Sequence, residues 1–399
     1  MYTYNLAKVL RNRGHEVIIY TRESGYFDKK IMEEDNCYDE IKVKTVYFNS
    51  GNRRFRFLRD FHLDFYNSTL DDHFNNFLDE IKPDILHIQH LAGLSASFIR
   101  IAKKRGIPIV LTLHDYWFMC SRIQLLTPRS KICSGPLNGF KCSRCLEPTL
   151  SPMAIWGLYP LHSSLFLFRT LFLRRMLNKV DLVIAPSNFL RNKFIQFGVA
   201  EKRIMFSDNG IESRNIKPSS RNEMRRFAFI GSIMPHKGIH VLIEAFNRLN
   251  SRTAELMIYG DPSYAPSYYE RLTKMATNSR IRFMGSFENG RVYDILSKID
   301  VLVIPSIWYE NSPLTIHEAA IAGVPVITSN IGGMAELIER MKSGLLFRVG
   351  DPIDLSEKMK LLIDKPDLYK ELVGRAEMVK TIEENGNELE GVYSKLIEK

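Results

Sequence analysis

The sequence of 399 residues predicts an α/β protein built from two doubly wound, parallel-sheet domains that face each other across a cleft. Short β-branched runs alternate with helical periodicity along the chain, and no repeat of solenoid length is visible. The composition, with 45% hydrophobic and 25% charged residues, is that of a globular protein, and the length suits two domains. A disordered chain, a collagen-like fibre and a small disulfide scaffold are thereby excluded.

Ten β-branched runs are expected to form buried parallel strands, with amphipathic helices between them. Residues 238–249 are typical of these helices, because Ile239, Leu242 and Phe246 share one face. The expected strands are residues 16–20, 84–87, 108–113, 181–185, 203–206, 226–230, 255–259, 281–284, 300–304 and 325–328.

A domain boundary is expected at residues 209–226, where Asn209-Gly210 and Pro218 separate two complete α/β blocks. The chain opens within an amphipathic helix, at residues 4–10. The strand and glycine turn that usually open such a domain are therefore expected to be missing. The resulting division is a first domain at residues 1–210, a second domain at residues 211–380, and a C-terminal helix at residues 381–399 that packs back on the first domain.

The net charge of +10 is concentrated in residues 101–200, which hold 14 Lys and Arg against 3 Asp and Glu. Such a field favours a polyanionic partner, although a merely solvated basic surface also explains it. Within it, residues 156–177 mix large apolar residues with Arg169, Arg174 and Arg175. This stretch is either an interfacial helix on an anionic membrane or a helix packed on its own domain. Four more arginines would join this surface if they lay on the same side: Arg53, Arg54, Arg56 and Arg59.

No run of about 18 apolar residues is present, so no membrane-spanning helix is expected. The chain shows no secretory signal and has five cysteines, an odd number, so the cytoplasm is the expected compartment.

The strongest motif runs from Glu310 to Glu318, with seven residues between the two carboxylates. Ser312 is expected to cap a helix and Pro313 to take its first position. A helix N-terminus presents free N–H groups and a positive dipole end to a phosphate. Two carboxylates beside such a turn suit a ligand with vicinal hydroxyls and phosphate. An ordinary loop acid and an ordinary helix acid are the alternative.

A second motif, from Gly231 to Gly238, also has the order strand, glycine loop, helix. Gly231 would let the backbone approach a ligand, and Lys237 would place a positive charge at a helix start. Glycine loops with a lysine are common. The position after the first strand of the second domain, where open α/β sheets bind ligands, makes this one more specific.

In this order, the two motifs resemble those of the retaining glycosyltransferases of family 4 (glycosyl transferases group 1). Their fold, called GT-B, consists of two Rossmann-like domains. The resemblance extends along nearly the whole chain. It is carried by Tyr4-Asn-Leu-Ala-Lys, Gly14-His-Glu-Val, Leu113-His-Asp-Tyr-Trp117, Pro186-Ser-Asn-Phe-Leu190, Asn209-Gly210-Ile211, Gly260-Asp261, Phe283-Met-Gly285, Asp300-Val-Leu-Val-Ile-Pro-Ser306 and Ala322-Gly-Val-Pro-Val326.

The resemblance implies roles for individual residues. Glu318 would hold the ribose hydroxyls of the nucleotide, and Lys237 would hold the donor diphosphate. Glu310 would contact the transferred sugar, and His114 would face that sugar across the cleft. The implied catalytic residues are therefore His114, Glu310 and Lys237. The implied donor-binding residues are Gly231, Ser232, Lys237, Gly260, Phe283, Met284, Gly285, Glu310, Asn311, Ser312, Pro313, Leu314 and Glu318.

The implied reaction transfers a sugar from a UDP- or GDP-type donor to a glycan or lipid-linked acceptor with retention of configuration. No cofactor is expected to be required for catalysis. The implied setting is cell-surface polysaccharide synthesis, expected in the cytoplasm at the inner face of the cell membrane. A peripheral contact with anionic membrane is expected from the apolar and basic stretch at residues 156–177.

One departure from the family pattern counts against full activity, because Ser232 stands where the family usually has arginine. Together with the missing strand, it leaves a degenerate or truncated paralogue, which binds nucleotide or membrane without turnover, as an alternative. A nucleotide-sugar epimerase or a glycogen-type synthase on the same fold is a second alternative. Nucleic-acid binding ranks last, since it leaves the motif from Glu310 to Glu318 unexplained.

Four cysteines with the spacing C-x12-C-x8-C-x2-C follow the strand that precedes His114. They could bind a structural zinc ion, and free thiols or a redox pair are the alternatives. His87 and His90, near a strand end, are expected to line the cleft rather than to bind metal. The four cysteines are Cys120, Cys133, Cys142 and Cys145.

Overall fold

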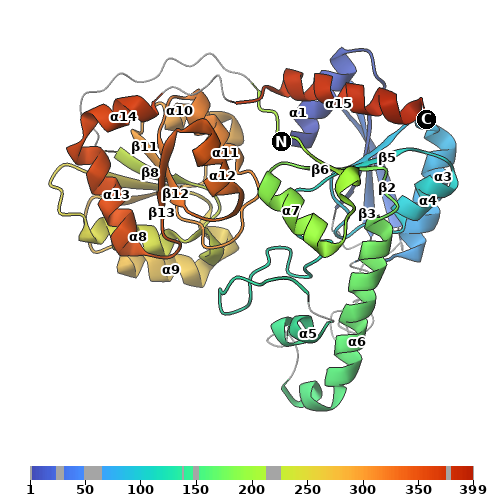
Figure 1. Cartoon of the computed structure of the whole chain (residues 1–399), viewed down its shortest axis with the longest axis horizontal. Helices are drawn as coiled ribbons and strands as arrows, with labels where there is room; N and C mark the ends of the chain where they lie inside the picture. Colours follow the sequence, from blue (N-terminus) through green and yellow to red (C-terminus); the bar gives the residue numbers. More distant parts are fainter. Residues whose placement is uncertain are drawn as a thin grey trace.

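The computed structural model describes residues 2–23, 31–48, 65–136, 139–146, 152–212, 226–373 and 379–398. It contains two α/β domains that lie side by side (Figure 1). The two parallel sheets expected from the sequence are present, so the predicted fold class is confirmed.

The first domain holds a four-stranded parallel sheet in which neighbouring strands follow one another along the chain. Hydrophobic side chains from one face of this sheet, including Ile109, Leu111 and Val183, pack with the helices that cover it in one core. Side chains from the other face, Val110 and Ile184, pack in a separate cluster with Leu6 and Leu389. The strands are β4 (Leu86–Ile88), β5 (Ile109–Thr112), β6 (Leu182–Ala185) and β7 (Ile204–Phe206), and the helices include α3 (Ser68–Ile81), α4 (Phe98–Lys104) and α7 (Asn188–Phe197).

A separate three-stranded sheet in the first domain has the order β1 (Ile18–Glu23), β3 (Ile41–Phe48), β2 (Ile31–Tyr38). Strands β2 and β3 form an antiparallel hairpin that the sequence analysis missed. Asp39 and Glu40 turn the chain with φ angles of 48° and 59°. This left-handed turn normally uses Asn-Gly or Asp-Gly, so its usual signal was absent from the sequence. The expectation of purely parallel strands is wrong for β2.

The two sheets of the first domain are not joined through any described strand, since β1 pairs with β3 and β4 pairs with β5. A cavity of about 620 Å³ separates β1 from β4. Its walls are largely apolar and come from both strands and from the helices that cover them. The cavity therefore lies between the two sheets of the first domain. Its apolar lining includes Leu6, Ala7, Ile19, Phe74, Leu86 and Phe98.

The second domain holds a six-stranded parallel sheet in the order β10-β9-β8-β11-β12-β13. Helices cover both faces of this sheet, as the doubly wound fold requires (Figure 1). One of its strands, β13, was not expected from the sequence. The strands are β8 (Arg226–Ile230), β9 (Glu255–Tyr259), β10 (Ile281–Gly285), β11 (Val301–Ile304), β12 (Val326–Ser329) and β13 (Gly344–Phe347). The helices are α8 (Ile239–Arg248), α9 (Pro266–Met275), α10 (Val292–Leu296), α11 (Leu314–Ile321), α12 (Gly332–Met341), α13 (Pro352–Asp364) and α14 (Pro366–Leu372).

The chain crosses between the domains twice, and the two crossings pair with each other. The Ile211 backbone N–H donates to Lys380 O at 3.0 Å, and the Ile382 N–H donates to Ile211 O at 2.9 Å. After the second crossing, α15 (Ile382–Ile397) packs against α1 (Tyr2–Asn12) of the first domain (Figure 1). The Tyr2 hydroxyl donates to Asn385 Oδ1 at 2.8 Å and fixes the two helices together.

Two further helices project from the first domain, the short α5 (Phe140–Leu146) and the long α6 (Pro152–Leu177) (Figure 1). Across the part of the chain that the structure describes, no helix is both long and apolar enough to cross a bilayer.

Candidate active site

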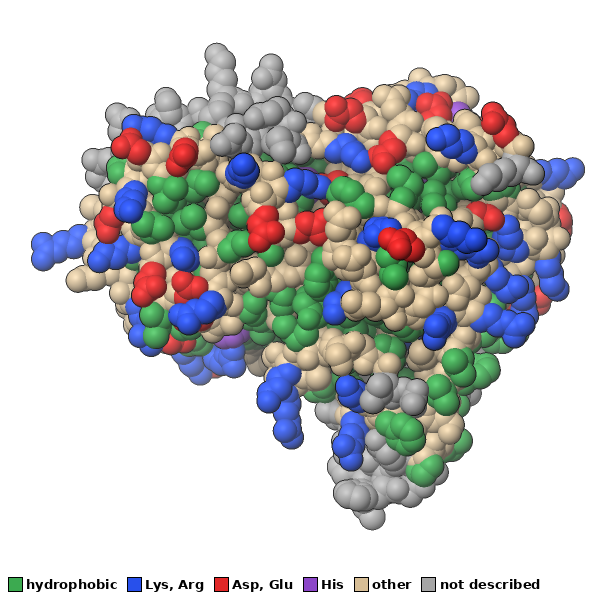
Figure 2. All heavy atoms as spheres, in the orientation of Figure 1, with side chains coloured by type: hydrophobic (Ala, Val, Ile, Leu, Met, Phe, Trp, Pro, Cys, Tyr) green, Lys and Arg blue, Asp and Glu red, His purple; other side chains and the backbone are tan. Residues whose placement is uncertain are grey.

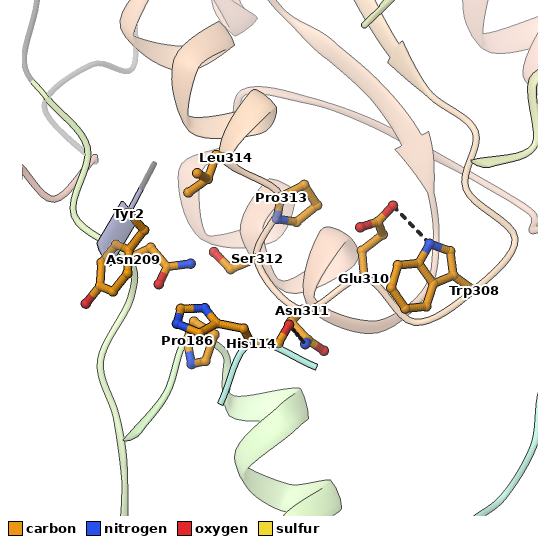
Figure 3. A pocket seen from close by; sticks show the side chains of 10 residues that line it. All are labelled: Tyr2, His114, Pro186, Asn209, Trp308, Glu310, Asn311, Ser312, Pro313 and Leu314. Carbon is orange, nitrogen blue, oxygen red and sulfur yellow. Dashed lines mark hydrogen bonds between the residues drawn. The ribbon is translucent and has the colours of Figure 1, made fainter. Parts of the chain in front are cut away.

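A cavity of about 160 Å³ lies between the two domains at the carboxyl ends of their strands (Figure 3). One wall is the turn from Trp308 to Leu314, which connects β11 to α11 in the second domain. The opposite wall comes from residues of the first domain and from the domain crossing: Tyr2, His114, Pro186 and Asn209.

Glu310 is the only carboxylate among the residues that line this cavity. One of its oxygens, Oε1, accepts three hydrogen bonds, from Lys237 Nζ at 2.6 Å, Ser306 Oγ at 2.8 Å and Trp308 Nε1 at 3.0 Å. Burial alone would raise the pKa of this carboxyl group, but the Lys237 charge and the three donors hold the pKa below its ordinary value. Glu310 is therefore an anion at neutral pH, with one oxygen fully engaged.

Glycine packing brings Lys237 to this carboxylate. Gly238, next to Lys237, has a φ of 71°, and a Cβ atom there would lie 1.9 Å from the carbonyl oxygen of Pro305. Only glycine permits this close approach between the lysine loop and the end of β11. The Lys237 ammonium also lies 5.7 Å from the centre of the Trp308 ring, a favourable cation–π contact.

The start of α11 differs from the sequence-based expectation. The helix begins at Leu314 and Pro313 occupies the capping position, with no side-chain cap. The Ser312 hydroxyl instead donates to Asp208 Oδ1 at 2.9 Å. The predicted Ser312 cap is therefore wrong, because a buried carboxylate takes up its hydroxyl. The first N–H groups of α11 have no side-chain cap and remain suited to a phosphate.

Asp208, which sequence reasoning missed, joins the first domain crossing to the site. Besides Ser312, its carboxylate contacts His317 Nε2 at 3.0 Å and the Arg340 guanidinium. Burial opposes ionisation, but these three partners together lower the pKa of Asp208 to about 2. The sequence shows an Asp before Asn209-Gly210 and no sign of partners more than a hundred residues away.

His114 follows β5 and faces the Glu310 turn from the first domain (Figure 3). Its Nε2 lies 2.7 Å from Gln89 Oε1, and its ring packs edge-on against Tyr2 at 5.4 Å between centroids. The Asn311 side-chain amide donates to the His114 carbonyl at 2.7 Å and so links the two walls. Burial is the main reason why the pKa of His114 falls to about 4, so its imidazole is neutral at pH 7.

The glycine positions of the predicted donor site lie at the ends of three neighbouring strands. The Gly260 N–H donates to Gly285 O at 2.8 Å. A Cβ atom on Gly260 would lie 2.1 Å from the carbonyl oxygen of Gly231. These glycines therefore bring the backbones of β8, β9 and β10 close together at the carboxyl end of the sheet.

The interdomain cavity gathers six of the predicted site residues, and the ion pair with Glu310 ties Lys237 to it. Glu318 lies half-buried on α11, one turn beyond this lining. The six lining residues are His114, Glu310, Asn311, Ser312, Pro313 and Leu314. Outside the lining lie Gly231, Ser232, Gly260, Phe283, Met284, Gly285 and Glu318.

Cys120, Cys133, Cys142 and Cys145 are free thiols, and Cys142 lies near enough to the other three to interact with them electrostatically. Burial, and then the charges of the other three, raise the pKa of Cys142 to about 12. Within the described ranges, no three His, Cys, Asp or Glu side chains are arranged to hold a metal ion, so zinc binding stays a prediction. His87 and His90 line the cavity between β1 and β4 rather than the interdomain cavity. Arg53, Arg54, Arg56 and Arg59 lie outside the described residues.

The chain is similar to known proteins along most of its length. Residues 1–214 match the family described as Glycosyltransferase Family 4, and residues 212–378 match Glycosyl transferases group 1. An uncharacterized 42.6 kDa protein in the cps region of Klebsiella pneumoniae is 25% identical over 69% of this chain and 65% of its own length. Sulfoquinovosyl transferase SQD2 of Arabidopsis thaliana is 23% identical over 74% of this chain. The match spans 52% of SQD2, about half of that relative.

A third relative is the GDP-mannose-dependent alpha-(1-6)-phosphatidylinositol monomannoside mannosyltransferase of Mycobacterium tuberculosis. It is 27% identical over 63% of this chain and 68% of its own length.

Two solved structures share the fold. Sucrose-phosphate synthase from Thermosynechococcus elongatus has a TM-score of 0.70 and 16% identity, covering 100% of this chain and 93% of that one. Anabaena Alr3699/HepE in complex with UDP and glucose has a TM-score of 0.67 and 16% identity, covering 99% and 95%. The family match covers more than half of the chain, and both domains have the expected architecture. The chain therefore belongs to glycosyltransferase family 4 and has the two-domain, Rossmann-like GT-B fold.

Proposed function

We propose that this protein transfers a sugar from a UDP- or GDP-type donor to a glycan or lipid-linked acceptor, with retention of anomeric configuration. The observation that carries the proposal is the Lys237–Glu310 ion pair, whose buried carboxylate lies opposite His114 in the interdomain cavity. A cation and an anion in contact at the carboxyl edge of a sheet suit a donor that carries both phosphate and hydroxyl groups.

The donor diphosphate would bind between Lys237 and the N-terminus of α11. Lys237 supplies a full positive charge, and the uncapped helix start supplies free N–H groups and a positive dipole end. Both groups are already in place before the reaction, so they can stabilise charge as it develops on the departing diphosphate. On this proposal the step draws on the protein's own charges and needs no added cofactor.

Retention is supported by the state of Glu310. Its Oε1 already accepts three hydrogen bonds and its pKa is lowered, which makes this carboxylate a weak nucleophile and a weak base. A double displacement needs a free carboxylate close to the reacting carbon. We therefore favour attack by the acceptor on the same face as the leaving diphosphate, which accepts the acceptor proton.

The names of similar proteins support the donor and acceptor classes. One relative is GDP-mannose-dependent and acts on a phosphatidylinositol mannoside, and one structure of the same fold contains UDP and glucose. A cps-region relative supports a role in cell-surface polysaccharide synthesis. We place this work at the inner face of the cell membrane, where a lipid-linked acceptor would be reached.

The donor assignment is tested by thermal unfolding of the chain with UDP-, GDP-, ADP- and dTDP-sugars. A ligand at about 100 times its Kd stabilises the native state by about 2.7 kcal/mol, which raises Tm by several degrees. We expect this shift with one nucleotide family, and we expect Lys237→Ala and Glu318→Ala each to abolish it. Lys274→Ala is the matched control, because Lys274 is an exposed lysine on α9.

A shift that survives both site variants would place the donor elsewhere and contradict the proposal. A shift without turnover, measured as release of the nucleoside diphosphate, would favour the degenerate paralogue instead. Retention is tested separately by the anomeric ¹H coupling of the product sugar, where an inverted product would contradict the same-face mechanism.

A further inference from the structure

The projecting part of the first domain carries an apolar face that no described element covers. Helix α6 buries one side against the domain, through Phe166, Leu173 and Leu177. Its other side leaves Leu161, Phe168 and Leu171 47%, 58% and 56% exposed. Three large apolar side chains at about half exposure on a single helix are unusual for a surface that faces only water.

These exposed residues form a continuous stripe along α6. Positions 161, 164, 168, 171 and 175 recur at intervals of three and four residues, which places them on one helical face, and all five are exposed. The stripe begins with Leu161 and ends at Arg175, with Arg174 beside it. It therefore has the apolar body and basic end of a helix that lies in a membrane interface.

The neighbouring helix extends the same surface. α5 packs against α6, and Ser143 and Ser163 lie 3.1 Å apart through their hydroxyl oxygens. Phe140, the first residue of α5, is 55% exposed. We call α5 and α6 together the α5–α6 lobe (residues 140–146 and 152–177). Figure 2 shows hydrophobic side chains gathered where this lobe projects below the body of the molecule.

The charge around the lobe has one sign. Residues 116–180 contain nine Lys and Arg and one Asp or Glu. Arg174 and Arg175 are exposed at the end of α6, and Lys141 is exposed on α5. Such a field attracts the anionic phosphates of a bilayer surface. Charge and exposed apolar area thus point to the same partner.

We propose that the α5–α6 lobe docks on an anionic lipid bilayer, with Leu161, Phe168 and Leu171 entering the interface and Arg174 and Arg175 on lipid phosphates. This docking rests on the proposed function, because the lipid-linked acceptor proposed there would be presented at the bilayer surface. The long axis of α6 would then lie in the membrane plane, because the exposed residues are spread along the helix from Leu161 to Arg175 and are not gathered at one end.

Sedimentation of the full chain with vesicles tests this. We expect binding to phosphatidylglycerol–phosphatidylcholine vesicles and much weaker binding to pure phosphatidylcholine, with loss of binding at high salt. Arg174→Gln with Arg175→Gln should weaken binding about 25-fold, at about fivefold for each charge near the surface. Phe168→Ser with Leu171→Ser should weaken it at least tenfold.

Matched controls lie on other elements. Ile353→Ser with Ile397→Ser removes two apolar residues that are 53% and 48% exposed on α13 and α15. Lys274→Gln with Arg282→Gln removes two exposed charges from the second domain. Neither pair should change vesicle binding. Equal losses in control and lobe variants, or no vesicle binding by the wild type, would overturn the proposal.

The assay also separates this proposal from the donor assignment, because it contains no donor. Lobe variants that lose vesicle binding should keep the donor-induced rise in Tm. If the wild type instead forms a dimer in sedimentation velocity, and Phe168→Ser with Leu171→Ser abolishes that dimer, the stripe is a protein interface and membrane docking is contradicted.

Discussion

Glu310 and Asp208 are the two buried carboxylates of the site, and different partners hold each of them as an anion. Glu310 is joined to Lys237 within the second domain. Asp208 contacts two helices of that domain from the domain crossing, through His317 and Arg340. On the proposed function, Lys237 and Glu310 would contact the donor, and the contacts of Asp208 would hold the second domain in place beside the domain crossing.

The Asp208 cluster leads to a prediction about stability. Asp208→Asn keeps the shape but leaves Arg340 and His317 without their anion, which should lower the free energy of unfolding by about 3 kcal/mol at pH 7. Urea denaturation measures this loss. Asp72→Asn, at an exposed position on α3, should change stability by no more than about 0.5 kcal/mol.

The same carboxylate also predicts a pH dependence. Its pKa in the folded protein, about 2, lies below the value of about 3.9 in an unfolded chain. The stabilisation it gives is therefore complete above pH 4 and is lost as the pH falls towards 2, by about 2 kcal/mol. Denaturation at pH 5 and at pH 2.5 should show a smaller difference for Asp208→Asn than for the wild type. An equal difference would contradict the assignment.

His114 leads to a prediction about activity. Because its pKa is about 4, the imidazole stays neutral from pH 8 to pH 5, and it should produce no step in kcat/KM near pH 6.5. If His114 contacts the transferred sugar, as the family resemblance implies, His114→Ala should lower kcat about 100-fold. A step near pH 6.5 in the wild type that His114→Ala removes would contradict the buried, neutral state.

Among the elements of the first domain, β1 and β4 are separated by a cavity and do not pack directly against each other. Ala7 on α1 lines this cavity, whereas Ala102 on α4 is fully buried in the packed core. Ala7→Leu should therefore raise the free energy of unfolding by about 1 kcal/mol, because added apolar atoms enter empty space. Ala102→Leu should lower it by about 1–3 kcal/mol through overpacking. Equal losses in thermal or urea unfolding would show that the cavity is closed in solution.

Most elements could be predicted because their signals are local. β-branched runs indicated the positions of ten strands, and Gly231 and Gly238 indicated the loop that follows β8. The hairpin of β2 and β3 was missed because Asp39-Glu40 adopts a left-handed turn without glycine or asparagine. Asp208 was missed because its partners lie on α11 and α12, and sequence periodicity carries no record of contacts at that separation.

At the scale of the whole molecule, one domain caps a helix of the other. Glu336, on α12 of the second domain, accepts from the backbone N–H groups of Asn188 and Phe189, each at 2.8 Å. These are the first residues of α7 in the first domain. A carboxylate on a helix N-terminus is favourable, so this contact stabilises the close arrangement of the domains.

Removing that cap should loosen the domain arrangement. Loss of this cap should weaken the contact between the domains by about 1 kcal/mol. Glu336→Ala should therefore increase the radius of gyration in small-angle X-ray scattering of the ligand-free chain. Glu339→Ala, on the same helix but exposed, should leave the scattering curve unchanged. Identical curves for Glu336→Ala and the wild type would show that other contacts hold the domains.

The measurement that most directly tests the central claim is hydrogen–deuterium exchange with and without the nucleotide-sugar that raises Tm. A donor site at the Glu310 turn predicts slower exchange in peptides covering residues 231–239 and 306–318, where Lys237, Glu310 and the start of α11 meet. Protection should disappear in Lys237→Ala. Protection confined to other peptides, such as residues 86–94 beside the cavity of the first domain, would contradict a donor site at the Glu310 turn.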